Sequence, residues 1–192
     1  MLSTLTSLYA RFFGALERLT EGWFLGLFAR FVFLAVIYVY YLNSAFTKVG
    51  EGVIGFFQIR FGAYIQILSE GVLSGYGFDA ANVPFFPQYL MVLFGTYGEF
   101  LLPLLVVIGL FTRIASLGMI GFILVQSYVD IVFHKADAET IGAWFDRDSP
   151  SLIMDQRLLW VFLLIVLVVK GAGTISIDTV IGKWWKNRIK GT

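Results

Sequence analysis

The sequence predicts an all-α, polytopic membrane protein: a four-helix bundle with additional amphipathic helices at the membrane interface. Hydrophobic residues make up 58% of the 192 residues and charged residues only 14%, whereas a soluble domain is about 45–50% apolar and about 25% charged. A soluble chain of this length has no interior large enough for so much apolar surface. In addition, four stretches reach the length of about 20 apolar residues that crosses a bilayer.

The four predicted spans cover residues 24–46, 88–111, 114–133 and 150–170. Pro150 suits the first turn of the fourth helix, and Gly171 and Gly173 are stop signals at its end. Together with their connections, the spans form a predicted membrane domain over residues 24–175.

A very short link joins the second and third predicted spans. Only Thr112 and Arg113 separate them, so the two helices should form an antiparallel hairpin. Residues whose numbers sum to about 225 would then lie at equal depth. This register places Glu99 level with Gln126.

Three further stretches have amphipathic patterns. In residues 1–23 apolar side chains recur every three or four positions, which predicts an interfacial helix before the first span. The tail, residues 176–192, combines apolar with basic residues in the same way. Residues 53–73 predict a re-entrant or surface helix between the first two spans.

Charge asymmetry predicts the orientation of the chain. An even number of spans puts both termini on one side, together with Arg113 and the basic tail. The other side holds eight acidic residues, counting Asp155 near the start of the fourth span. The positive-inside rule then makes the side with the termini cytoplasmic. We therefore predict a multi-pass protein of the bacterial inner membrane with both termini in the cytoplasm.

Composition also excludes several kinds of chemistry. The net charge of +1 offers no basic field for nucleic acid. The absence of cysteine excludes disulfides, thiolate metal sites and iron–sulfur ligation. The single histidine, His134, excludes a bis-histidine haem within the chain and makes a poor transition-metal site with carboxylates alone. We predict no metal and no intrinsic cofactor.

Glu99 is the clearest ionisable residue within a predicted span. It lies about 18 Å from the cytoplasmic end of its helix at 1.5 Å per residue. Because burying a charge in hydrocarbon costs about 2.5–3.5 kcal/mol on insertion scales, Glu99 should be protonated or paired. Arg30, in the first span, is the expected partner. The pair is either functional or purely structural, and Arg30 could instead extend alone to the membrane surface.

The third span adds a polar stripe. Gln126, Asp130 and His134 are four residues apart and so share a helix face. We predict a central polar layer of Arg30, Glu99 and Gln126 and an outer layer of Asn43, Asp130, His134 and Arg157. Glu99, Asp130 and His134 are predicted to handle protons, with Asp130 orienting the His134 ring; His134 could instead simply mark the membrane edge. The residues predicted to bind a substrate are Arg30, Gln126, Asn43 and Arg157.

Several motifs resemble the DoxX family of small bacterial membrane proteins. These are GEFLLPLL at residues 98–105 and GLFTR at residues 109–113. The family usually has an arginine in its first span and a lysine just after it, as at Arg30 and Lys48. Its usual end, Gly-x-Gly followed by Ser-x-Asp, matches Gly171, Gly173, Ser176 and Asp178.

The resemblance implies a four-helix membrane protein but no single reaction. The family is named for a small subunit of an archaeal terminal oxidase and thiosulfate:quinone oxidoreductase. Other members resemble accessory proteins, and distant relatives act as chaperones of membrane proteins. This chain departs from a minimal member in its amino-terminal helix, in residues 50–87 and in its acidic loop at residues 136–149, each large enough to bind a partner.

Three functions follow as hypotheses. The first is an accessory or quinone-interacting subunit of a membrane redox or stress-response complex, which binds quinone but carries no electrons itself. The second is a membrane-protein assembly factor or chaperone without catalysis. The third is a small proton-coupled transporter that uses Glu99 and Asp130. All three place the chain in the bilayer, with a partner subunit or a second copy of itself.

Overall fold

Four long helices dominate the computed structural model, which describes residues 2–190, and side chains within residues 4–189. No strand occurs in this described range beyond one isolated bridge between Val49 and Ile59. The four helices long and apolar enough to span a membrane are Phe24–Thr47, Phe85–Ile108, Thr112–Phe133 and Leu152–Lys170. The predicted all-α membrane fold is therefore confirmed.

Each span combines α-helix with a π-helical stretch. The first comprises α2 (Phe24–Val32), η1 (Phe33–Tyr38) and α3 (Val39–Thr47); the second, η3 (Phe85–Tyr89) and α7 (Leu90–Ile108); the third, α8 (Thr112–Tyr128) and η4 (Val129–Phe133); the fourth, η5 (Leu152–Gln156) and α10 (Arg157–Lys170). π-Helical turns occur frequently at functional sites. In three of the four spans the π-helical turn lies at the end away from the chain termini.

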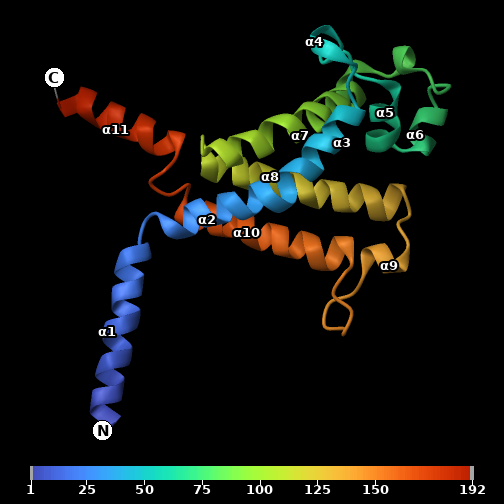
Figure 1. Ribbon diagram of the computed structural model, residues 1–192. Coiled ribbons are helices and arrows are strands. Elements are labelled where there is room, and N and C mark those ends of the chain that lie inside the picture. Colours follow the sequence, from blue (N-terminus) through green and yellow to red (C-terminus); the bar gives the residue numbers. More distant parts are fainter. Residues whose placement is uncertain (1, 191–192) are drawn as a thin grey trace.

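The spans pack side by side as an antiparallel bundle (Figure 1). The helix α10 contacts α8 and α2, while α7 contacts α8 and α3. Phe33, Ile37, Met119 and Leu164 are fully buried where the helices meet. Large apolar side chains on the outward faces, among them Phe162, stay exposed in the isolated chain and so offer a surface to lipid. Packing of buried side chains, rather than water exclusion, holds such helices together in lipid.

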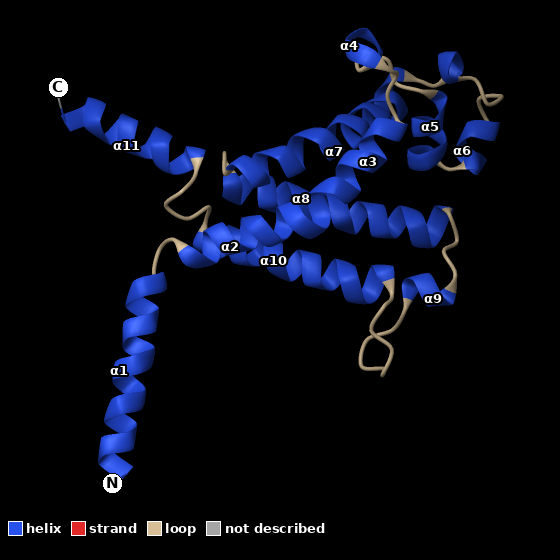
Figure 2. Cartoon of the chain, viewed as in Figure 1, coloured by secondary structure: helices blue, strands red, loops and turns tan. Residues whose placement is uncertain are grey.

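Both chain ends leave the bundle at the same end, which we call the terminal end; the opposite end is the distal end (Figures 1 and 2). The helix α1 (Leu2–Thr20) runs transverse to the bundle, and α11 (Ile177–Lys190) extends away from it. The helices predicted at both ends are thus present. Their apolar side chains, such as Phe12 and Trp184, remain exposed, as expected for helices that lie on a membrane surface.

The hairpin between α7 and α8 differs from the prediction. Gly109 adopts the left-handed conformation, with φ of 71°, and ends α7 three residues early. The turn is therefore residues 109–111, and α8 already begins at Thr112. The predicted turn at Thr112 and Arg113 was wrong.

This shift changes which residues lie level with one another. A methyl group on Gly98 would lie 3.2 Å from the Phe122 ring, and one on Gly118 would lie 3.0 Å from Leu102. In both facing pairs the residue numbers sum to 220, not 225. Glu99 is therefore level with Gly121, and Gln126 lies farther toward the distal end.

The segment between the first two spans folds into several short helices that cap the distal end of α7. The predicted single helix over residues 53–73 was wrong, because the chain breaks after Gly55 and again at Ser69, whose φ is 67°. A second apolar cluster, which includes Tyr64, Leu73 and Val92, holds this cap against α7. The short helices are α4 (Gly52–Gly55), α5 (Phe61–Leu68), α6 (Glu70–Ser74) and η2 (Ala80–Asn82).

A short helix, α9 (Ala138–Ile141), lies in the acidic distal loop. Its N-cap is Asp137, whose carboxylate accepts a hydrogen bond from the Thr140 amide at 2.7 Å. This hydrogen bond holds the pKa of Asp137 below its ordinary value of 3.8. The hydrogen bond therefore caps the first turn of α9.

Candidate functional site

A buried ion pair links the first and second spans. Lys48, at the end of α3, places its Nζ 2.8 Å from Oε2 of Glu99 in α7. Ser44, one turn before Lys48, donates to Oε1 of Glu99 at 3.2 Å and accepts from Lys48 Nζ at 2.8 Å. The side chains of Lys48 and Glu99 are only 4% and 5% exposed. The buried carboxylate therefore has a cationic partner, as a charge in hydrocarbon requires.

The predicted partner of Glu99 was wrong. Arg30 lies near the terminal end, where Nε and Nη2 donate to the carbonyls of Val106 and Val107 at the end of α7. Its Nη1 donates to the carbonyls of Ala172 and Ile175 at 3.2 and 2.6 Å. Arg30 thus satisfies the last carbonyls of α7 and ties them to the chain that follows α10. The central layer of Arg30, Glu99 and Gln126 does not form.

Asp178 completes this arrangement from the other side of the turn. Its carboxylate accepts hydrogen bonds from the amides of Phe111 and Thr112 and from the Thr112 hydroxyl, at 2.7–2.9 Å. Its own amide donates to Gly109 O at 2.9 Å. The α7–α8 turn is therefore held at both helix ends. We call Arg30, Gly109, Thr112 and Asp178 the terminal junction, and its role is structural.

A second ion pair lies in the distal half of the bundle. Arg157, the first residue of α10, is 2% exposed; its Nη2 donates to Oδ2 of Asp130 at 2.6 Å and its Nη1 to the Ser127 hydroxyl at 2.9 Å. Asp130 therefore pairs with Arg157 and not with His134. The side chain of His134 is exposed, and its Nε2 lies 3.0 Å from the carbonyl of Gln66 in α5. The predicted outer layer is present in part.

The remaining predicted residues have separate surroundings. Gln126 accepts a hydrogen bond from the Tyr41 hydroxyl at 2.9 Å and donates to the Tyr40 hydroxyl at 3.3 Å. It binds these tyrosines of α3 and not Glu99, in agreement with the corrected register. Asn43 is exposed on the bundle surface.

One cavity of about 530 Å³ brings most of these groups together. It lies between α7 and α8 toward the distal end, where the two helices diverge from their turn (Figure 1), and α5 covers one side. We call it the distal cavity. Of the predicted site residues Glu99, Gln126, Asp130 and His134 line it; Arg30, Asn43 and Arg157 do not, although Arg157 holds Asp130 in place.

The rest of the cavity wall is mostly apolar. Phe94 and Val125 stand at its mouth and are more than half exposed. Gly121, also in the wall, has open space where a Cβ would lie. The cavity thus joins a surface that faces lipid to a buried ion pair.

In the sequence, Lys48 stands out only as the lysine after the first span; neither its pairing with Glu99 nor the contribution of Ser44 was predicted. Lys48 and Ser44 both line the distal cavity. A signal was present, because Tyr41, Ser44 and Lys48 are three and four residues apart and so lie on one face of α3. Within residues 2–190 no cluster of three metal-ligating side chains forms.

The fold and the buried pairs define a multi-pass, four-helix membrane protein with polar residues enclosed between its spans. Comparison of the chain with protein-family models, with curated proteins and with solved structures gives no match.

Proposed function

We propose that this protein is a DoxX-like membrane subunit that binds the head group of an isoprenoid quinone in the distal cavity and serves a membrane redox complex. The observation that carries the proposal is a cavity of about 530 Å³ that is bordered by exposed apolar side chains and lined by Lys48, Glu99, Asp130 and His134. Ligand pockets are typically about 300–1,000 Å³ and combine apolar walls with a few placed polar groups.

Access to the cavity suits a ligand that is dissolved in the membrane. Its mouth is formed by side chains such as Met91, Phe94 and Val125, which the isolated chain leaves exposed. A ring can enter there from the acyl-chain region while its isoprenoid tail stays in lipid. A water-soluble ligand would have to cross this apolar border.

The polar groups suit a ligand that exchanges protons. Asp130 uses Oδ2 for Arg157 and is 29% exposed, so Oδ1 can accept a proton or a hydroxyl hydrogen bond. His134 can accept or donate at the same wall. Both lie nearer the distal surface than Glu99, so protons have a short way to water. The buried Lys48–Glu99 pair supplies the field at the inner wall.

A bound quinone would supply two-electron chemistry, and a partner subunit would exchange the electrons with it. With no cysteine and one histidine, the chain offers no ligand set for an iron–sulfur cluster or a bis-histidine haem. The protein's own part is to hold the ring, exclude water and exchange protons with the ring at Asp130 and His134. We therefore propose that the protein is an accessory subunit.

The resemblance to the DoxX family supports this proposal at particular residues. Lys48 and Glu99 form the buried pair of the cavity, whereas Arg30, Gly109 and Asp178 build the terminal junction. In this proposal Lys48 and Glu99 lie at the ligand site, whereas the residues of the terminal junction have a structural role. The basic residues of α11 and of the terminal end further support a cytoplasmic location for both termini in a bacterial inner membrane.

The test is to fill the cavity without disturbing its polar groups. Gly121→Phe adds a ring where a Cβ meets no atom within 4 Å. Leu117→Phe, on the exposed face of α8 outside the cavity, is the matched control. Each variant is purified from native membranes in mild detergent, and quinone per mole of protein is measured chromatographically.

We expect Gly121→Phe to lose most of the co-purified quinone, while Leu117→Phe and the parent chain retain it. His134→Gln, at an exposed side chain of the cavity wall, should lower quinone-linked turnover of the complex while the complex still assembles. Equal quinone content in all variants, or none in the parent chain even after incubation with decylubiquinone, would contradict the proposal.

A second candidate function is an assembly factor that binds other membrane proteins. The observation in its favour is the acidic distal loop, which exposes Trp144 and Phe145 beside Asp146 and Asp148. Aromatic side chains are enriched at interfaces. Removal of residues 136–149 should then lose a partner that co-purifies with the parent chain, and recovery of the same partner would argue against this function.

A further inference from the structure

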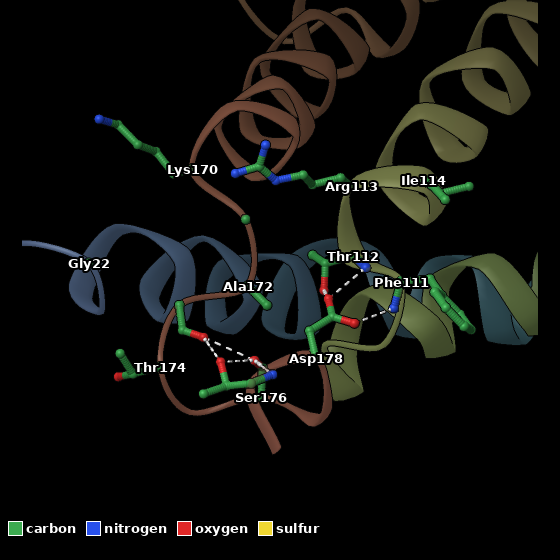
Figure 3. A pocket seen from close by; sticks show the side chains of 13 residues that line it. Gly22, Phe111, Thr112, Arg113, Ile114, Lys170, Ala172, Thr174, Ser176 and Asp178 are labelled. Atoms are coloured by element: carbon green, nitrogen blue, oxygen red, sulfur yellow. Dashed lines mark hydrogen bonds between the residues drawn. The ribbon is translucent and has the colours of Figure 1, made fainter. Parts of the chain in front are cut away.

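A second cavity lies at the terminal end of the bundle, opposite to the end that holds the distal cavity. Its volume is about 500 Å³, and it lies between the start of α8 and the chain that leaves α10 (Figure 3). Its lining includes Gly22, Arg113, Lys170 and Thr174. We call it the terminal cavity.

The charged residues at this cavity differ in whether their side chains have hydrogen-bond or ion-pair partners. The carboxylate of Asp178, the acidic residue of the cavity, accepts hydrogen bonds from the amides of Phe111 and Thr112 and from the Thr112 hydroxyl (Figure 3). In the part of the chain that the structure describes, neither the Arg113 side chain nor the Lys170 side chain has a hydrogen-bonding or ion-pair partner. Two cationic side chains with no partner among the described residues therefore border the cavity, whereas its carboxylate is already hydrogen-bonded to the α7–α8 turn.

Arg113 is the charged residue of the GLFTR motif, and the terminal junction does not use its side chain. Gly109 forms the turn and Thr112 binds Asp178, whereas the Arg113 side chain reaches across toward the chain after α10 (Figure 3). A methyl group on Gly171 would lie 3.5 Å from Arg113 Nε, which shows how near the guanidinium comes to that loop. The positive end of the α8 dipole adds to the field in the same place.

The position of the cavity indicates the source of an anionic ligand. Arg113 is the second residue of the third span and Lys170 the last of the fourth, so the cavity lies at the level where helices leave the hydrocarbon. The amphipathic helices α1 and α11 lie on either side of this end. Basic pockets between spanning helices at this depth are suited to lipid phosphates.

We propose that the terminal cavity binds the phosphate of an anionic phospholipid, with Arg113 and Lys170 as its charged contacts. Arg113 offers a planar fork of donors for a phosphodiester, and Lys170 adds a point charge beside it. The loop of Gly171 and Gly173 borders the site with little side-chain bulk. This site is independent of the quinone proposed for the distal cavity.

The test compares two variants that remove the same charge. Arg113→Gln/Lys170→Gln removes both cations from the cavity, where Asp178 remains, and Lys183→Gln/Lys186→Gln removes two cations from α11, outside it. The proteins are exchanged into nanodiscs that contain phosphatidylcholine with a minor fraction of phosphatidylglycerol. The lipid retained after delipidation is counted by native mass spectrometry.

We expect the parent chain and the α11 variant to retain phosphatidylglycerol in preference to phosphatidylcholine. Since a charge-assisted hydrogen bond to a phosphate contributes roughly tenfold to binding, the cavity variant should bind about 100-fold more weakly. Thermal unfolding of all three proteins in detergent without lipid should coincide, which excludes misfolding.

Three results would overturn the proposal. One is no preference for phosphatidylglycerol in the parent chain. Another is an equal loss in both variants, which would mean general surface attraction. The third is stabilisation by inorganic phosphate alone that matches or exceeds that by the lipid, which would assign the site to a soluble anion.

Discussion

The buried pair of Lys48 and Glu99 allows a sharp test, because its two halves should be far more costly to remove singly than together. Lys48→Met removes the 2.8 Å contact with Glu99 and two hydrogen bonds to Ser44. It leaves a carboxylate in a site where the side chain is 5% exposed. Loss of one partner of a buried pair costs about 3–5 kcal/mol.

The double variant Lys48→Met/Glu99→Leu should behave differently. It replaces both charges with apolar side chains of similar size, a change that is often neutral or stabilising. We expect each single variant to lose about 3–5 kcal/mol of the free energy of unfolding and the double variant to recover most of it. The coupling free energy should therefore exceed about 3 kcal/mol.

The assay is reversible unfolding in mixed micelles, followed by tryptophan fluorescence. A matched cycle on Arg60 and Glu51, an exposed pair at 3.3 Å, should give a coupling below about 1 kcal/mol. If the losses at Lys48 and Glu99 simply add, or if the double variant is the least stable, the buried pairing is refuted. A double variant that folds but retains no quinone would show that the charges serve binding and not stability.

Three other predictions concern the parts that surround the site. Asp178→Ala removes three hydrogen bonds from the start of α8 and should cost about 1–3 kcal/mol in the same unfolding assay, with helix content unchanged; a loss below about 0.5 kcal/mol would contradict the structural role of the junction. Because the Thr140 hydrogen bonds lower the pKa of Asp137, this cap stabilises α9 at any pH above 3.8 and is lost as the pH falls through the lower folded-state pKa. The amide NMR signal of Thr140 should therefore titrate with a midpoint below 3.8, and a midpoint at or above that value would refute the cap. Gly26→Ala should destabilise strongly, since its Cβ would lie 2.5 Å from the Gly173 nitrogen, while Gly182→Ala, with nothing within 4 Å, should be neutral or slightly stabilising in thermal unfolding; equal melting temperatures for the two would be inconsistent with the packing of α2 on that loop.

The spans could be predicted because their signal is local and strong. A run of about 20 apolar residues has few alternatives in a bilayer, so composition alone located all four helices. Their ends were less certain, since the end of α7 depends on the left-handed conformation of Gly109. That glycine precedes the predicted turn by three residues, and this offset displaced the whole hairpin register.

Only some residues of the candidate site were predicted, and none of their pairings. Glu99, Gln126, Asp130 and His134 do line one cavity, because polar side chains within spans avoid lipid. The partners could not be derived, because a long side chain such as that of Arg30 can reach several acceptors and depth alone does not choose between them. Its true acceptors are backbone carbonyls exposed at a helix end, and residue patterns carry no sign of these.

The measurement that tests the proposed ligand site most directly is photolabelling with an azido-quinone in native membranes, followed by peptide mapping. Label should appear on α7 and α8 residues that line the distal cavity, between Met91 and Glu99 and between Gly118 and Asp130, and Gly121→Phe should abolish it. Label confined to α1, α11 or the lipid-facing side of α10, or label unchanged in Gly121→Phe, would contradict quinone binding in the distal cavity.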